Sequence, residues 1–598
     1  MNIMNITNKI SKISATLIVL LLFLSCNKFL DKQPLTQFTD NNYWTSEAEV
    51  QLFCNGFYSE FNGFGTGAAS TRSSNLGTGA ESDFYFNCLS DDQDQTMTSG
   101  INVFLTTAPG TANTWNTPYN FIRLANLLLA RIDKVPNLSD AAKNHYRGIA
   151  YFFRAMEYYD LVRHYGDVPY TNKYLDQNED SSIIWGPRIA RNIVMDSVLS
   201  DLNHAIANLY SKNVADATSG LGTNTVNQDV ANALKSRICL FEGTYAKYVE
   251  GNTQRATQYL QACQTASEAI INSGTYKLYP DYRTVYSSLS LSTNGGECML
   301  YRIYDMESSV HVYHQVINYC NSSTLINGLT KDAVDAFLCT DGLPISLSPL
   351  YQGDNPVNIG TSSAPIYSIT NTTLKNRDKR LAETIDTALG YVGNPFGQLA
   401  SSTGYIITRF NNPGVYNTTN NDTWAPIFWL PEILLNEAEA TAELGNFTQA
   451  VADNTINLLR ARAGVASLEV NNIPNDPNKD ADVSSLIWEI RRERRVELML
   501  WIGRYWDLRR WNKVFYLDPK VKPNIFVGAK VPLGTFVNPD GTPAGGGQDA
   551  NGYIQVYAPA TAALRVVSLP QVSLDPIPTG QLQLYQSKNI TFPQNPGW

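Results

Sequence analysis

The chain has 598 residues, of which 43% are hydrophobic and 17% are charged, and its formal net charge is −9. A chain of this length exceeds what one hydrophobic core usually supports, so it forms either several domains or one large elongated helical assembly. The acidic balance offers nothing to attract a polyanion, which argues against nucleic acid as a partner.

Residues 1–25 have the pattern of an export signal. Lys9 and Lys12 precede an apolar run over residues 13–24, and a serine and Cys26 follow directly. This run is too short to cross a bilayer of about 30 Å as a helix. A small residue before a cysteine at this place resembles a bacterial lipobox, in which Cys26 becomes the lipidated first residue. The segment predicts a protein anchored by acyl chains; an ordinary signal peptide with an incidental cysteine is the alternative.

Helical periodicity begins near Trp115, which we expect to lie in the core. From 147 to 165 apolar residues recur at i, i+3, i+4 and i+7, the pattern of a helix that buries one stripe. The run Gly-Asp-Val-Pro at 166–169 ends this helix. Further helices are expected over residues 191–209, 229–248 and 254–273.

The cysteines after Cys26 show no C-x-x-C spacing and no histidine-rich neighbourhood. They therefore predict neither a zinc site nor a disulfide framework. Cys239 and Cys263 lie among apolar residues of the expected helices, where we expect small buried hydrophobes.

Between residues 277 and 416 the pattern becomes irregular. Short β-rich runs occur at 299–304 and 404–410, separated by long polar loops. This region predicts a second subdomain inserted in the helical scaffold, because loops of this length in a compact protein usually carry function.

The clearest helical pair covers residues 433–444 and 447–462. Ala440, Gly445 and Ala450 stand where tetratricopeptide-like pairs place small residues at the helix contact and the turn. Such pairs cannot bury their apolar faces alone, so several are expected to stack into a curved solenoid.

A charge-dense helix is expected from 489 to 510. Its crowded arginines could suggest a phosphate or nucleic-acid site, but Glu489 precedes Arg492 by three residues and Glu497 follows Arg494 by three. Opposite charges at this spacing pair along a helix, so the pattern favours a structural ion-pair network.

A series of short motifs runs along the whole chain. They are C-N-K-F-L-D at 26–31, N-Y-W at 42–44, F-R-A at 153–155, L-V-R-H-Y-G-D-V-P at 161–169, D-A-F at 335–337, D-G-L-P at 341–344, N-R-D-K-R-L at 376–381, L-R-A-R-A-G at 459–464, R-E-R-R-V-E-L at 492–498, W-D-L at 506–508 and Q-N-P-G-W at 594–598. In this order they resemble the SusD-like, or RagB-like, nutrient-binding outer-membrane lipoproteins of Bacteroidetes. Pro431 stands where that family continues a helix, and we expect it in a first turn.

The resemblance implies a mostly α fold. Four tetratricopeptide-like helix pairs would form a right-handed superhelical scaffold, joined to an irregular, loop-rich subdomain with short strands. The expected boundaries are a signal peptide at 1–25 and a SusD-like domain at 26–598, with helical segments at about 40–275 and 425–515, the ligand-binding subdomain at about 276–424 and a C-terminal extension at 516–598.

The resemblance also implies a function without a reaction. A protein of this family at the bacterial outer-membrane surface binds a nutrient glycan and delivers it to a SusC-like TonB-dependent transporter. Two alternatives stay open: a peptide-binding member of the same uptake system, and a surface glycosidase, which would need two suitably spaced carboxyl groups.

The family's ligand residues lie in variable loops without a transferable motif, so the candidates come from residue chemistry. Sugar binding needs flat aromatic faces beside planar polar groups. The candidates are Asp83, Tyr85, Asn87, Tyr304, Tyr313, Tyr319 and Trp424. No cofactor is expected, although the acidic loop 91–94 could hold a structural calcium and is more typical of a solvated turn. His311 and His314 lack an evident third ligand, which favours an accidental pair over a metal site.

Overall fold

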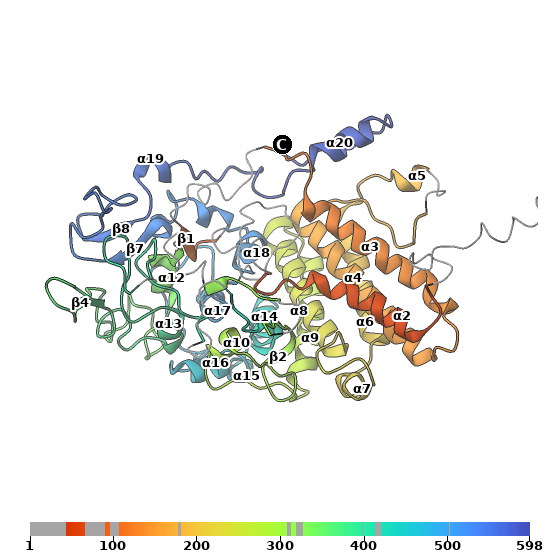
Figure 1. The fold of residues 1–598 in the computed structure, drawn as a ribbon, viewed down its shortest axis with the longest axis horizontal. Helices are drawn as coiled ribbons and strands as arrows, with labels where there is room; N and C mark the ends of the chain where they lie inside the picture. Colours follow the sequence, from red (N-terminus) through yellow and green to blue (C-terminus); the bar gives the residue numbers. More distant parts are fainter. Residues whose placement is uncertain are drawn as a thin grey trace, which may run out of the picture.

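The computed structural model describes residues 43–65, 90–95, 107–176, 181–307, 312–317, 327–397, 399–412, 420–501 and 503–598. The predicted export signal and Cys26 lie outside these residues. Long helices occupy one side of the molecule, and short strands and loops occupy the other (Figure 1). None of the helices in the described ranges is long and apolar enough to span a membrane.

The helices carry most of the regular structure. The longer ones are α2 (Glu47–Asn55), α3 (Asn113–Arg131), α4 (Asp140–Tyr165), α6 (Arg191–Asn208), α8 (Gln228–Tyr245), α9 (Thr253–Ile271), α14 (Leu430–Glu443), α16 (Ile456–Ala463), α17 (Ser485–Glu497), α18 (Gly503–Arg510) and α20 (Thr579–Gln586). The short ones are α5 (Ser181–Ile184), α7 (Lys212–Ala217), α10 (Thr284–Ser287), α12 (Lys331–Ala336), α13 (Lys379–Thr384), α15 (Gln449–Asn454) and α19 (Pro559–Ala562). Single turns form η1 (Gly56–Glu60), η4 (Ile132–Lys134), η5 (Ala246–Glu250), η6 (Val514–Leu517) and η7 (Pro523–Phe526).

The scaffold is a row of neighbouring helices. Contacts run from α3 to α4, α6, α8, α9, α14 and α17 in turn. Helix α4 starts earlier than expected because Ser139 caps it by accepting from the backbone N–H of Ala142, and it ends at Gly166 with a φ of +71°. The predicted mostly α fold with a tetratricopeptide-like scaffold is confirmed. Trp115, Cys239 and Cys263 are buried, as expected.

The described strands form four antiparallel two-stranded sheets. The pairs join β1 (Gln93–Gln95) to β3 (Asn327–Leu329), β2 (Cys298–Arg302) to β6 (Ala425–Trp429), β4 (Val357–Asn358) to β5 (Tyr367–Ser368), and β7 (Val527–Lys530) to β8 (Tyr553–Gln555). Strand β6 continues directly into α14, whose first turn contains Pro431, as expected. The predicted β-rich run at 404–410 is wrong, because it makes only an isolated bridge between Ile407 and Ile385.

Two expected helices are broken in the structure. The segment 447–462 divides into α15 and α16 at Thr455, whose hydroxyl donates to the carbonyl of Val451 at 2.5 Å while its backbone leaves the helical region. The segment 489–510 divides into α17 and α18, and between them Leu500 has a φ of +66°. A leucine rarely adopts this conformation, and here its side chain is buried against the core. A helical spacing pattern does not reveal such local breaks.

The arginines of α17 and α18 form the predicted structural network. Arg492 pairs with Glu489 at 3.2 Å, as expected. The expected pair of Arg494 and Glu497 is wrong: Arg494 binds Asp507 at 2.8 Å. Glu497 instead accepts from Arg380 at 2.8 Å. Arg494 meets Asp507 of the next helix, α18, and this partner takes the place of the neighbour in its own helix.

The acidic loop 91–94 is not a solvated turn. Asp91 is 1% exposed and accepts two hydrogen bonds of 2.7 Å from Arg504, and Asp92 accepts one of 2.7 Å from Arg495. Burial raises the pKa of Asp91, but Arg495 and Arg504 outweigh burial and hold that pKa below its ordinary value. Guanidinium groups therefore bind two of the three carboxylates of this loop, and the third, Asp94, accepts from the hydroxyl of Tyr557.

Removal of one arginine from the network should destabilise the fold. Arg380 is 1% exposed and binds the carboxylates of Asp378, Glu493 and Glu497. Arg380→Met should lower the free energy of unfolding by about 3–5 kcal/mol, because buried carboxylates lose their cation. Urea unfolding measures this. The control is Arg147→Met, which removes a partly exposed pair with Asp133 and should cost less than about 1 kcal/mol. Equal losses in both variants would contradict the role of the network.

Candidate functional site

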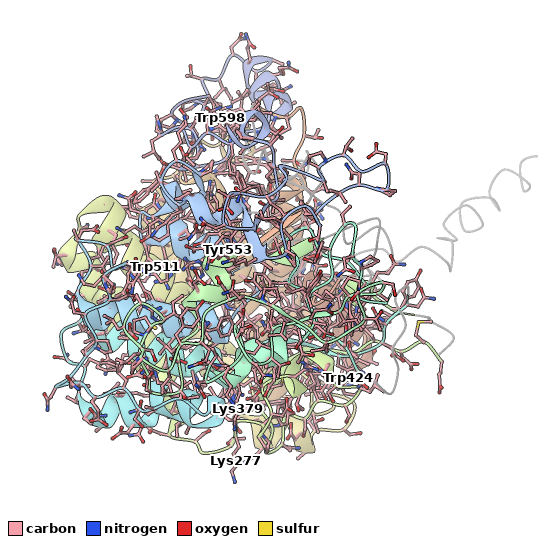
Figure 2. All side chains as sticks on the ribbon, turned by 90° about the vertical axis from the view of Figure 1, so that its left-hand side faces the viewer. Lys277, Lys379, Trp424, Trp511, Tyr553 and Trp598 are labelled. Carbon is pink, nitrogen blue, oxygen red and sulfur yellow. The ribbon has the colours of Figure 1, made fainter. Side chains whose placement is uncertain are left out.

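A stacked aromatic pair lies on the loop-rich side of the molecule. The rings of Tyr301, on β2, and Trp424, directly before β6, have centroids 5.1 Å apart and planes 17° apart. Both side chains are half-buried. The indole N–H of Trp424 donates to the carbonyl of Tyr304 at 3.2 Å, and Asn224 binds the backbone of Tyr301 on both sides. These bonds hold a partly exposed aromatic surface, and Figure 2 shows Trp424 toward one edge of this side.

Tyr304 supports this surface from within. It is 2% exposed, so it does not offer the ligand contact that the sequence predicted. Its hydroxyl donates to the carbonyl of Gly65 at 2.7 Å. Gly63 allows this close packing: its φ is +53°, and a side chain there would meet Ala425 at 2.8 Å. Tyr304 was predicted to contact the ligand, but it is buried and hydrogen-bonded inside the protein, so it supports the aromatic pair from below.

The remaining predicted residues divide into two groups. Tyr313 is half-buried and precedes His314, whose ring lies 4.7 Å from that of Tyr304 and bonds Thr423. Tyr313 is thus next in sequence to a core residue, and no contact with the aromatic pair is found for it among the described residues. Burial lowers the pKa of His314 to about 3, so this ring is neutral and packed in the core. Asp83, Tyr85, Asn87, Tyr319 and His311 lie outside the described residues.

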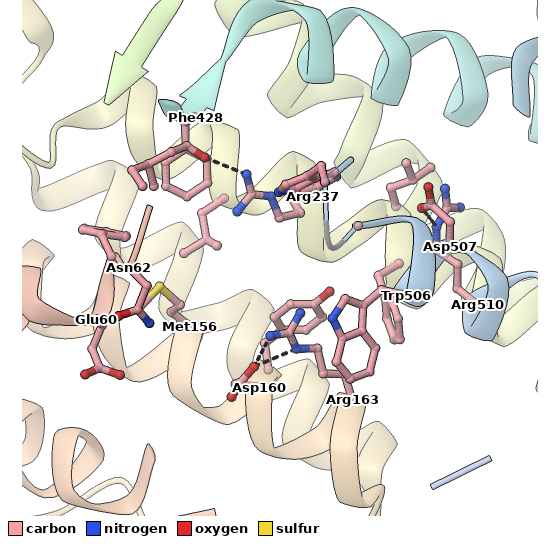
Figure 3. A pocket seen from close by; sticks show the side chains of 18 of the residues that line it. Glu60, Asn62, Met156, Asp160, Arg163, Arg237, Phe428, Trp506, Asp507 and Arg510 are labelled. Carbon is pink, nitrogen blue, oxygen red and sulfur yellow. Dashed lines mark hydrogen bonds and ion pairs between the residues drawn. The ribbon is translucent and has the colours of Figure 1, made fainter. Parts of the chain in front are cut away.

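A polar cavity of about 140 Å³ lies on the opposite side of the segment 60–62. Its walls come from η1, α4, α8, β6, α17 and α18, and Figure 3 shows Glu60, Asn62 and Met156 on one side and Arg237 and Trp506 on the other. No motif or periodicity in the sequence predicts this cavity. Its one available signal was a glutamate, Glu157, in the apolar middle of α4.

Some charged groups that line the cavity have partners of opposite charge, and others have none among the described residues. Arg163 binds Asp160 at 2.7 Å, and Arg237 binds Glu432 at 2.7 Å. Within the described part of the chain, Oε1 of Glu157 has no hydrogen-bond partner, although this side chain is only 3% exposed. Burial, and then the charges of Glu60 and Asp160, raise the pKa of Glu157 well above its ordinary value.

Glu60 shares this environment. Burial, followed by the charge of Asp160, raises the pKa of Glu60 to about 8. Two carboxyl groups that form no ion pair within the described ranges thus face one cavity. Burial and the nearby acidic groups outweigh the charge of Arg163, which lowers the pKa of Glu157, and Arg163 itself is bound to Asp160. Such strongly perturbed groups in a cavity are candidates for ligand contacts.

Comparison with known proteins gives the family. The model of the SusD family matches residues 286–598, more than half of the chain. The chain belongs to the SusD family. A second family model, described as starch-binding associating with outer membrane, matches residues 28–240. Together the two matches include most of the helical scaffold and the loop-rich side, and leave residues 241–285, with α9, between them.

Individual relatives of the SusD family agree with this assignment. A SusD-like protein of Formosa agariphila is 24% identical over 84% of this chain and 92% of its own length. The crystal structure of a SusD-like carbohydrate-binding protein of Bacteroides fragilis has a TM-score of 0.65 at 18% identity and covers 91% of this chain and 99% of that one. A laminarin-binding SusD-like protein has a TM-score of 0.55 at 18% identity, and the match covers 93% of this chain and 100% of that one. At such identities the structures establish the shared fold.

The unpartnered carboxyl of Glu157 generates a prediction for this SusD-family chain. Its pKa is higher in the folded than in the unfolded state, so its ionisation opposes folding increasingly as the pH rises above the unfolded value. Glu157→Gln cannot ionise. We expect it to exceed the parent in unfolding free energy by about 1–3 kcal/mol at pH 8 and to match it at pH 4.

Urea unfolding at both pH values checks this. The control is Glu469→Gln, at an exposed position, which should match the parent at pH 8 as well. A Glu157→Gln variant less stable than the parent at pH 8 would show that the carboxylate has a stabilising partner.

Proposed function

We propose that this protein is a lipid-anchored glycan-binding protein of the bacterial outer-membrane surface, which delivers a nutrient glycan to a SusC-like TonB-dependent transporter without cleaving it. Membership of the SusD family supports the proposal, as does the outer-membrane association in the description of the second family model. The lipobox-like segment that ends at Cys26 supports the anchor. The carbohydrate- and laminarin-binding relatives support a glycan ligand.

The observation that carries the glycan assignment is the stacked pair of Tyr301 and Trp424. The apolar face of a pyranose packs on a flat aromatic ring, and the sugar hydroxyls need planar polar groups nearby. The indole N–H of Trp424 donates to the carbonyl of Tyr304, and the Asn224 side chain binds the backbone of Tyr301. The pair is therefore already held in place, and binding costs little side-chain entropy. The exposed carboxylate of Asp305 follows on the same segment and provides a planar acceptor.

Substitution of Trp424 tests the glycan site. Trp424→Ala should weaken binding to the preferred polysaccharide by about tenfold or more, since each 1.4 kcal/mol of lost contact is about tenfold. Trp424→Phe keeps a flat ring and should retain part of the affinity. Affinity gels with bacterial, plant and host polysaccharides give the ligand, and the same gels report any cleavage.

The matched control is Trp185→Ala. Trp185 is also half-buried, but its ring meets that of Tyr585 edge-on, with centroids 5.5 Å apart and planes at 88°. Its substitution should not affect retardation. Equal retardation of the Trp424→Ala variant and the parent would show that the aromatic pair does not bind the glycan. Binding to peptides alone would replace the glycan by a peptide ligand, and release of sugar products would make the protein a glycosidase.

Cys26 provides a second test. Cys26→Ser removes the thiol that the acyl chain requires, so the variant should leave the membrane fraction and become soluble after export. Protease treatment of intact cells should degrade the parent protein if it faces outward. Continued membrane association of the variant, or protection of the parent, would contradict the proposed anchor or the proposed surface position, respectively.

A further inference from the structure

The cavity beside η1 contains acidic groups that the fold itself does not use. Oε1 of Glu157 is buried and has no hydrogen-bond partner in the described ranges, and no hydrogen bond or ion pair is found there for the carboxylate of Glu60. A buried polar atom without a partner costs free energy, and native proteins rarely retain one without a reason. A ligand that donates hydrogen bonds would satisfy both groups.

The charges that face the cavity come from five elements. They are Glu60 on η1, Glu157, Asp160 and Arg163 on α4, Arg237 on α8, Arg494 on α17, and Asp507 and Arg510 on α18. Each of these arginines has a carboxylate partner. Arg163 binds Asp160, Arg237 binds Glu432, Arg494 binds Asp507, and Arg510 binds Glu439 and Asp507. The carboxyls of Glu60 and Glu157 are left in excess, so the cavity favours a cation.

We propose that this cavity binds a protonated primary amine, the ammonium group of a small ligand, between Glu60 and Glu157. An ammonium group carries a full positive charge and three N–H donors, which suit two carboxylates and the side-chain oxygen of Asn62. The carbon atoms of the ligand would pack against Met156 and Phe428, which also line the cavity. The site lies across the segment 60–62 from the aromatic pair and goes beyond the proposed glycan binding.

Other ligand classes fit this cavity less well. An anion would be repelled by two carboxyl groups that form no ion pair in the described part of the chain. It would also find every arginine of the cavity already bound to an acidic side chain. A divalent metal ion needs several oxygen or nitrogen ligands, and no cluster of three metal-ligating side chains occurs among the described residues. A volume of about 140 Å³ admits an ammonium group with part of a sugar ring or a short alkyl chain.

The probe is glucosamine, measured by calorimetry against the full-length mature protein at pH 8, with glucose and N-acetylglucosamine as neutral controls of the same ring. We expect glucosamine to bind at least tenfold more tightly than either control. Glu157→Gln and Glu60→Gln should each lose this preference, whereas Glu469→Gln, an exposed exchange of the same kind, should keep it. Trp424→Ala should also keep it, which separates this site from the glycan surface.

The source of the amine is distinguished by a second probe. Lysinamide presents primary ammonium groups, at its α and ε positions, on a peptide-like ligand. Tighter binding of lysinamide than of glucosamine would support the ammonium site and assign it to peptides, and the reverse would assign it to amino sugars. Binding should also weaken from pH 8 to pH 6, because each carboxyl must release its proton before it pairs with the amine. The proposal is overturned if neither amine binds more tightly than glucose, or if the correctly folded Glu157→Gln variant binds both amines as the parent does.

Discussion

Buried pairs of arginine with aspartate or glutamate join parts of the chain that are hundreds of residues apart. Arg495 and Arg504, on α17 and the start of α18, bind Asp91 and Asp92 near the N-terminus. Arg510 binds Glu439 of α14 through two hydrogen bonds. Removing so many charges from water is costly, and only complete pairing compensates for this cost. The arrangement of α17 and α18 therefore constrains every segment that supplies a partner.

The same network reaches the aromatic surface. Arg462 binds Glu297, the residue directly before β2, and it also binds Glu497 of α17. Strand β2 carries Tyr301 and pairs with β6, directly after Trp424. The stacked rings thus stand on a strand pair whose start is tied to the charged core. A rigid scaffold below an exposed ring is the arrangement that a preorganised binding surface requires.

The polar cavity differs from the network because it contains acidic groups that form no ion pair with any described residue. Each carboxyl group of the network named above binds at least one arginine, whereas among the described residues Glu157 forms no ion pair, its Oε1 has no hydrogen-bond partner, and the charge of Glu60 lies nearby. The segment 60–65 separates the two places: its side chains reach the cavity, and its carbonyls at Asn62 and Gly65 accept from Tyr304 behind the aromatic surface. Both places therefore depend on the backbone of this short segment.

Most helices of the scaffold, the burial of Trp115, the presence of an ion-pair network and the family are predicted from the amino-acid sequence, because periodicity and ordered motifs are local properties of the chain. Which side chains contact one another follows only from the folded arrangement. In the fold Arg494 pairs with Asp507 and not with Glu497, the side chain of Tyr304 is buried, and the charge of Glu60 lies near Glu157. Such choices depend on contacts between distant segments, whose geometry a one-dimensional spacing cannot contain.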